Sequence, residues 1–150
     1  MSSCGMKECS GEVMTKTQMS FFRMAKNASE LSDFPRIKIG AIVVNKHRVV
    51  SSGCNSFTKR HRLQVKYNRE RFDEPSDGCV HAEMSALIPL VNKEDLSRAS
   101  IYVYRQLKDG SLGMCRPCKA CMALIKNLGI RKVYYTTYDG YAEEYIEKID

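Results

Sequence analysis

The sequence lacks any apolar run long enough to cross a membrane. Its longest such run covers residues 39–44, whereas a membrane-spanning helix needs about 20 apolar residues. The first fourteen residues also lack the apolar segment of a secretory signal peptide. We therefore expect a protein that works in the cytoplasm and has no membrane as partner.

Internal repeats and low-complexity segments are absent as well. The sequence contains seven cysteines, an odd number that cannot all pair in disulfides. Because two of them stand in a Cys-x-x-Cys pair, the odd count favours metal binding in a reducing compartment over a disulfide framework. A chain of 150 residues fits one domain, which we place at 15–150 behind a flexible tail at 1–14. Cys4 and Cys9 lie in that tail, where free thiols and ligands of a second metal both stay open.

Acidic residues are few relative to basic ones. The 24 lysines and arginines exceed the 17 acidic residues, which gives a net charge of +7 at pH 7. Many of the cations gather in residues 59–71, where Lys59, Arg60 and Arg62 stand near aromatic side chains. This excess indicates a phosphorylated or polyanionic partner, although a solvated loop that keeps the protein in solution explains the same charges.

Hydrophobic periodicity predicts alternating helices and strands. Apolar residues at helical spacing predict three helices, at 17–33, 81–87 and 118–128. Runs rich in β-branched and aromatic residues predict four strands, at 37–44, 48–54, 101–104 and 132–136. Thr17 is the expected cap of the first helix, and a further short helix is expected around residues 63–66.

The end of the chain decides how many strands the sheet contains. The Asp139-Gly140 pair favours a tight hairpin and hence a fifth, antiparallel strand, although residues 141–149 also suit a helix. The fold class expected is α/β. Its predicted architecture has three layers, with a mixed sheet of about five strands between helices on both faces.

Two short stretches concentrate residues that suit metal chemistry. The first reads His-x-Glu at His81 and Glu83, and the second is the Pro-Cys-x-x-Cys of Cys118 and Cys121. Zinc favours nitrogen and sulfur donors, and a catalytic zinc site has three protein ligands with its fourth position open to water. We therefore expect His81, Cys118 and Cys121 to bind Zn²⁺. Both stretches are predicted to lie at the N-termini of helices. The partial positive charge of a helix N-terminus favours the thiolate form of a cysteine.

Glu83 is the candidate proton shuttle. It stands too close to His81 in sequence to be a convenient fourth ligand, but it can reach a water on the metal. Zinc brings the pKa of a bound water towards about 7, which provides a nucleophile near neutral pH. Glu83 would accept a proton from that water and pass it to the substrate. The predicted reaction is a hydrolysis with Zn²⁺ as cofactor.

Together the two stretches match the signature of zinc-dependent nucleobase deaminases, and the chain resembles the cytidine and deoxycytidylate deaminase superfamily. Deoxycytidylate deaminases look nearest. The segments at 53–55 and 128–133 also carry the likeness. The resemblance implies a cytidine-deaminase-like fold, substrate contact by Asn55, a backbone contact from Ala82 to the base, and assembly into homo-oligomers. It also implies a small cytosine nucleotide as substrate, so that dCMP or CMP becomes the uracil nucleotide with release of ammonia.

Several other interpretations stay open on the sequence. In the main hypothesis, Lys59, Arg60 and Arg62 bind the single phosphate of the nucleotide. The same segment suits a deaminase of bases in RNA or single-stranded DNA, and a free nucleoside is a further candidate substrate. A zinc module that binds nucleic acid without turnover is the alternative of another class. Asn55 also suits a turn, with no substrate contact.

Overall fold

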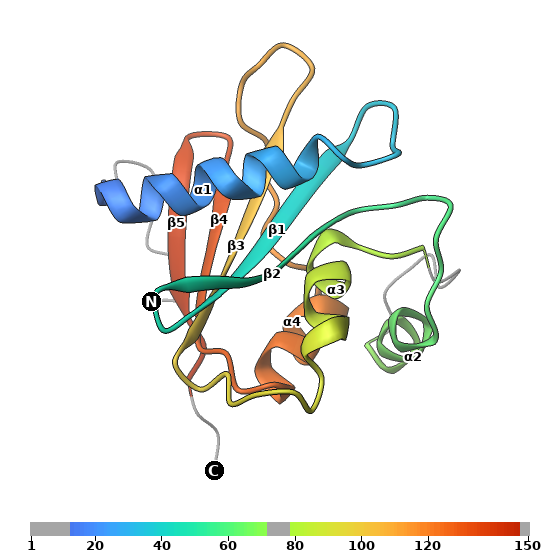
Figure 1. Ribbon diagram of the computed structural model, residues 1–150. Coiled ribbons are helices and arrows are strands. Elements are labelled where there is room, and N and C mark those ends of the chain that lie inside the picture. Colours follow the sequence, from blue (N-terminus) through green and yellow to red (C-terminus); the bar gives the residue numbers. More distant parts are fainter. Residues whose placement is uncertain (1–12, 72–78, 148–150) are drawn as a thin grey trace.

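The computed structural model describes residues 13–71 and 79–147, which form a five-stranded sheet in the order β2-β1-β3-β4-β5 (Figure 1). The strands are β1 (Lys38–Asn45), β2 (Arg48–Cys54), β3 (Ala99–Gln106), β4 (Lys132–Thr137) and β5 (Gly140–Tyr145). Strands β3 and β4 run parallel, and the other neighbouring pairs are antiparallel. The predicted mixed sheet is therefore confirmed.

Helices lie on both faces of this sheet (Figure 1). Helix α1 (Lys16–Ser29) covers one face, and α3 (Ala82–Leu87) and α4 (Lys119–Asn127) cover the other. Helix α2 (Arg62–Glu70) packs against α4, and a 3₁₀ turn at Ile88–Leu90 follows α3. The predicted three layers are confirmed. None of the described helices combines the length and apolar character that crossing a membrane requires.

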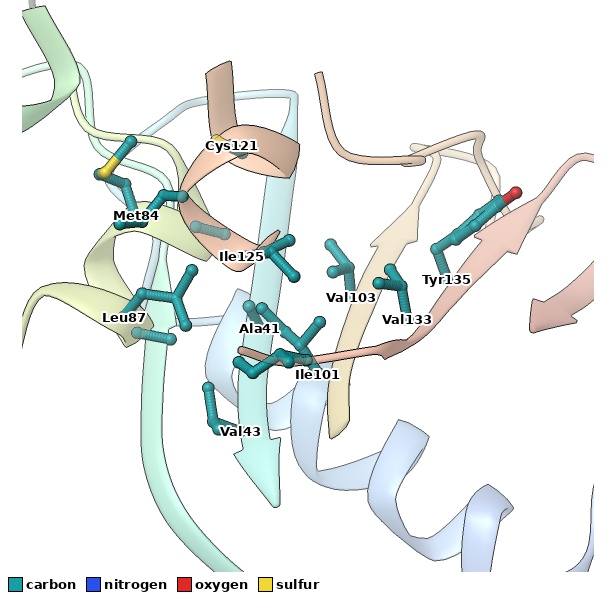
Figure 2. Packing of buried hydrophobic residues seen from close by; sticks show 14 of the residues in the cluster. Ala41, Val43, Met84, Leu87, Ile101, Val103, Cys121, Ile125, Val133 and Tyr135 are labelled. Carbon is teal, nitrogen blue, oxygen red and sulfur yellow. The ribbon is translucent and has the colours of Figure 1, made fainter. Parts of the chain in front are cut away.

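The inner strand β1 shows why both faces need helices. Successive side chains of a strand point to opposite faces, and residues 41–44 are all buried. Ala41 and Val43 belong to the cluster beneath α3 and α4, whereas Ile42 and Val44 belong to the cluster beneath α1. Figure 2 shows the first cluster, in which side chains from both helices meet those of β1, β3 and β4. A strand buried on both sides reads as one apolar run, as residues 39–44 do.

The predicted cap of the first helix was wrong. Thr15 caps α1, because its hydroxyl accepts a hydrogen bond from the backbone N–H of Gln18 at 3.1 Å. The side chain of Gln18 returns a bond by accepting from the backbone N–H of Thr15 at 2.9 Å. This reciprocal pair is a capping box, which needs Gln or Glu three residues after the cap. Thr17 lies within the first turn and has no such partner in the sequence.

The other predicted elements are present where the structure describes them, although α1 ends at Ser29 and not at the predicted residue 33. The short helix near 63–66 is α2, and residues 141–145 belong to strand β5, whose first residue, Gly140, adopts a φ of 146° directly after the turn. Most of the tail, with Cys4 and Cys9, lies outside the described residues, as do the loop at 73–78 and residue 149. The boundaries of the single domain at 15–150 therefore stay a prediction.

Gly40 sets how closely α1 approaches the sheet. A Cβ at this position would overlap the backbone carbonyl of Ala25 and the backbone amide of Ser29, which cannot rotate away. We expect Gly40→Ala to lower the free energy of unfolding, measured by urea denaturation, by about 3 kcal/mol. Gly113→Ala is the matched control, because its Cβ would meet side chains that can move. Equal losses in the two variants would contradict the close approach.

Candidate active site

Three metal-binding side chains converge where α3 and α4 begin. His81 is the N-cap of α3, Cys118 is the N-cap of α4, and Cys121 follows one turn later. The Nδ1 atom of His81 lies 3.3 Å from Sγ of Cys121 and 3.6 Å from Sγ of Cys118. The three ligand atoms lie within 4.8 Å of one another. One nitrogen and two sulfur donors at this spacing suit Zn²⁺, so the predicted ligand set is confirmed as a group that can hold the metal.

Helix α2 positions His81 through a buried amide. The backbone N–H of His81 donates to Oε1 of Gln64 at 3.0 Å, and Nε2 of Gln64 donates to Oδ1 of Asn68 at 2.9 Å. Gln64 is 0% exposed. Because an unpaired buried amide is unfavourable, these bonds fix the segment that carries the ligand. No local pattern indicates this role, since Gln64 is one polar residue in a basic segment of the sequence.

Cys118 differs from the nearby Cys115 in its electrostatic surroundings. Hydrogen bonding with Cys121, and then with His81, lowers the pKa of the Cys118 thiol to about 4. Burial raises the pKa of Cys115 to about 12, and its sulfur contacts the carbonyl of Val103 at 3.3 Å. Metal binding needs thiolate. Cys118 is therefore prepared to bind zinc, whereas Cys115 is a neutral core residue.

Glu83 lies in the first turn of α3 and is 6% exposed. Burial raises the pKa of its carboxyl to about 7, although the nearby His81 lowers the pKa. A carboxyl with a pKa near 7 can both accept and donate a proton at neutral pH, as general acid–base catalysis requires. A bound zinc cation would favour the charged form. The predicted proton shuttle thus lies beside the predicted metal.

Glu83, His81 and Cys118 line a cavity of about 570 Å³, a volume that suits a small organic ligand. Its walls are mostly apolar and include Ile37 and Met114, both partly exposed. Phe34 and Phe57 stand at 5.4 Å between ring centroids and form a further part of the wall. An apolar cavity with few polar groups is the usual form of a small-molecule site.

The loop that carries Phe57 is tied to Asp33. This carboxylate accepts hydrogen bonds from the hydroxyls of Ser56 and Thr58 and from the backbone N–H of Phe57. The bonds from Thr58 and Ser56 lower the pKa of Asp33 to about 2. The carboxylate therefore stays charged under ordinary conditions and keeps its three donors, which holds one wall of the cavity in place.

Two of the predicted substrate residues line this cavity. Ala82 is the first residue of α3 and is buried next to His81. The side chain of Asn55 accepts from the backbone N–H of Ile39 at 2.9 Å and donates to the carbonyl of Ile37 at 2.7 Å. These bonds join the end of β2 to the start of β1. An amide group has two N–H donors, so Asn55 retains one N–H for a ligand.

The three basic residues predicted to bind phosphate are not among the cavity's lining residues. Lys59, Arg60 and Arg62 are exposed, and Nη1 of Arg60 donates to the carbonyl of Phe57 at 3.1 Å. The lining contains a different cation, Arg116, which directly precedes the Pro-Cys-x-x-Cys motif. The three basic residues therefore lie next to the cavity wall that contains Phe57, but they do not line the cavity.

Arg116 is held in a fixed orientation by strand β5. Its Nε and Nη2 atoms donate to the two carboxylate oxygens of Glu144 at 2.8 and 2.7 Å. The hydroxyl of Tyr135 donates to the same carboxylate at 3.1 Å, and Arg116 holds the pKa of Glu144 below its usual range. A two-point bond of this kind fixes the guanidinium plane. The sequence could not reveal this pair, because Glu144 comes 28 residues later in the chain.

Comparison with known proteins agrees with this site. The model of the cytidine and deoxycytidylate deaminase zinc-binding region matches residues 15–137. The deoxycytidylate deaminase of Mycobacterium phage D29 is 32% identical over 126 residues, which cover 77% of this chain and 90% of that protein. The dCMP deaminase of cyanophage S-TIM5, solved in apo form, aligns with a TM-score of 0.59 at 21% identity over 83% of this chain and 86% of its own.

A second solved structure supports the same fold. The cytidine deaminase of Burkholderia pseudomallei aligns with a TM-score of 0.58 at 21% identity, over 88% of this chain and 93% of its own. A three-layer fold with a His-Cys-Cys centre and a buried glutamate defines the class of zinc-dependent hydrolytic deaminases. Within that class the chain belongs to the cytidine and deoxycytidylate deaminase family, as its motifs predicted.

Zinc content separates the ligands from the proton shuttle. We expect Cys121→Ala to lose stoichiometric zinc, because it removes one of three ligands, and Glu83→Ala to retain it. Cys115→Ala is the matched control for a cysteine outside the ligand set. Metal analysis of the purified variants, with circular dichroism to confirm folding, measures the difference. Zinc loss in Glu83→Ala as complete as that in Cys121→Ala would make the carboxylate a ligand.

Proposed function

We propose that the protein deaminates a cytosine nucleotide by hydrolysis, converting dCMP or CMP and water into the uracil nucleotide and ammonia. The observation that carries this proposal is the burial of Glu83 beside His81, Cys118 and Cys121 at a cavity of about 570 Å³. The similarity to the phage D29 deoxycytidylate deaminase supports a nucleotide substrate. The cyanophage S-TIM5 enzyme has also been solved in complex with dCMP and dUMP.

The residues of the site divide the chemistry among them. His81, Cys118 and Cys121 would hold Zn²⁺, which when bound supplies a Lewis acid that makes water nucleophilic near neutral pH. Glu83 accepts a proton from the attacking water and gives it to N3 of cytosine, so that C4 becomes a better electrophile. The same carboxyl then helps protonate the amino nitrogen, which leaves as ammonia. The apolar walls exclude bulk water from these transfers.

Other residues of the cavity orient the base and sugar. In this proposal the backbone of Ala82, which lines the cavity at the start of α3, holds the base, and the remaining N–H of Asn55 bonds a substrate hydroxyl. Both roles are part of the proposal. A cytoplasmic location and assembly into homo-oligomers stay predictions from the sequence.

Ammonia release tests the reaction directly. We expect zinc-loaded protein to release ammonia from dCMP or CMP, and Glu83→Gln to lower kcat by about 10²–10⁴-fold, because it removes the proton carrier. Cys115→Ala should keep most activity. The panel includes cytidine, deoxycytidine, and RNA and DNA oligonucleotides. Zinc-loaded protein that deaminates none of these compounds would overturn the proposal in favour of a binding module without turnover.

Arg116 is the better placed of two candidates for the phosphate. Its bonds to Glu144 use two of the five guanidinium N–H groups and Tyr135 is a further hydrogen-bond partner, which leaves two donors at a residue that lines the cavity. Its side chain is 46% exposed, so these donors are accessible. Fixing the guanidinium in advance reduces the entropy lost when a phosphate binds. Lys59, Arg60 and Arg62 lack such a position in the cavity.

Replacing each candidate set separates the two hypotheses. We expect Arg116→Ala to lower kcat/KM for the monophosphate by about 10–100-fold, the loss expected for hydrogen bonds between charged groups. Activity on deoxycytidine should change little. The triple replacement of Lys59, Arg60 and Arg62 by Ala should keep the preference for the monophosphate. The reverse pattern would return the phosphate to the basic segment.

One observation favours polynucleotides as second candidate substrates. Phe57 is 45% exposed at the cavity wall, and Arg60 bonds to its carbonyl. Exposed aromatic rings beside cations are typical of single-stranded nucleic-acid sites. Turnover of an oligonucleotide above that of any monophosphate, with a steep loss between low and moderate salt, would establish this function.

A further inference from the structure

The chain that leads into α3 is hydrogen-bonded to the chain that leads into α2. The backbone N–H of Val80 donates to the carbonyl of Lys59 at 3.2 Å, and the carbonyl of Val80 accepts from the backbone N–H of Ser56 at 2.9 Å. One residue later, the backbone N–H of His81 donates to the side chain of Gln64 in α2. The metal ligand and the residue before it are therefore both placed by this one part of the chain.

The buried face of α2 is largely polar. Gln64, Tyr67 and Asn68 are its buried residues, and their spacing of three and four places them on one side of the helix. A buried amide is unfavourable unless its hydrogen bonds are formed, whereas apolar side chains would fill the same space without that requirement. The polar character of this face therefore indicates a role beyond packing.

The amide of Gln64 is held in one orientation. Its Nε2 atom donates to Oδ1 of Asn68, and this bond directs Oε1 of Gln64 to the backbone N–H of His81. A buried polar network that is satisfied in this way favours a single arrangement over others. Gln64 thus fixes where the chain turns into α3 at the ligand.

The same face of α2 also contacts the helix that carries the cysteine ligands. The hydroxyl of Tyr67 accepts from Nδ2 of Asn127, the last residue of α4, at 2.9 Å, and the two helices pack against each other. Cys118 and Cys121 lie at the other end of α4. Helix α2 is therefore hydrogen-bonded both to the segment with the histidine ligand and to the helix with the cysteine ligands.

We propose that α2 sets the zinc affinity of the site, with Gln64 and Tyr67 as positioning residues. Gln64 holds the segment of His81, and Tyr67 holds α4, so that the three ligand atoms lie within 4.8 Å of one another before metal binds. A site that is arranged in advance loses less free energy to ordering when its ligand binds. The inference rests on the ligand set of the proposed function and adds α2 to it.

Zinc affinity, measured by competition with a chromophoric chelator, tests the role of Gln64. We expect Gln64→Met to bind zinc about 10–100-fold more weakly, because it removes the acceptor for the His81 N–H while it keeps a side chain of similar length; partners of metal ligands typically have effects of this size. Arg69→Met is the matched control, since it places the same residue at an exposed position of α2 and should retain the wild-type affinity.

Tyr67→Phe tests the second contact with the smallest change available. It removes the hydroxyl that accepts from Asn127 and keeps the ring that packs in the core. We expect zinc binding to weaken by about 2–10-fold, the effect of one hydrogen bond.

The visible absorption of Co²⁺ bound in place of zinc separates positioning from general stability, because the spectrum depends on the arrangement of the donor atoms. We expect Gln64→Met to change the Co²⁺ spectrum. Gly40→Ala, which is expected to destabilise the packing of α1 on the opposite face of the sheet, should leave that spectrum as in the wild-type protein. A Gln64 that served stability alone would leave the spectrum unchanged in both variants.

Four results would overturn the proposal. They are wild-type zinc affinity in folded Gln64→Met, an unchanged Co²⁺ spectrum in that variant, an equal loss of affinity in Arg69→Met, and an altered spectrum in Gly40→Ala. If circular dichroism shows that Gln64→Met does not fold, Tyr67→Phe decides the test, and wild-type affinity in that variant overturns the proposal. None of these measurements needs turnover, so failure of this inference and absence of deamination are distinct outcomes.

Discussion

The packing of α3 and α4 on one face of the sheet is the interaction on which the site depends. Cys121 belongs to both the metal centre and the hydrophobic core, because it is 0% exposed and packs in the same cluster as Ile125 and Met84 (Figure 2). His81 and Cys118 begin the two packed helices. A change in the position of either helix would therefore alter the ligand distances, so the core sets the geometry of the metal centre.

The sequence predicted what local patterns and spacing can reveal. Strands buried on two faces, helices that begin at Pro-Cys or His-x-Glu, and the Asp-Gly hairpin all have local signals, and the structure contains each of them. The metal ligands could also be predicted from the sequence, because only a few residue types bind zinc. The cap of α1 also has a local signal, because Thr15 is followed three residues later by Gln18, whereas Thr17 has no such partner.

Contacts between distant parts of the chain had no such signal. Gln64 supports His81, and Glu144 orients Arg116, through hydrogen bonds that span 17 and 28 residues of sequence. Polar residues of these types occur widely on surfaces, so only the tertiary fold distinguishes them. The basic segment shows the same limit. Charge is visible in a sequence, but the cavity that a charged side chain faces is not.

The parallel pairing of β3 with β4 has a consequence for how the protein acquires its metal. Two parallel neighbours need a crossover, and here α4 is that crossover and carries Cys118 and Cys121. His81 stands 40 positions before Cys121, so in an unfolded chain the ligands form no common site. Zinc therefore binds the assembled sheet and helices far better than any earlier folding stage. Metal occupancy then reports on native structure, and zinc shifts the folding equilibrium towards the native state.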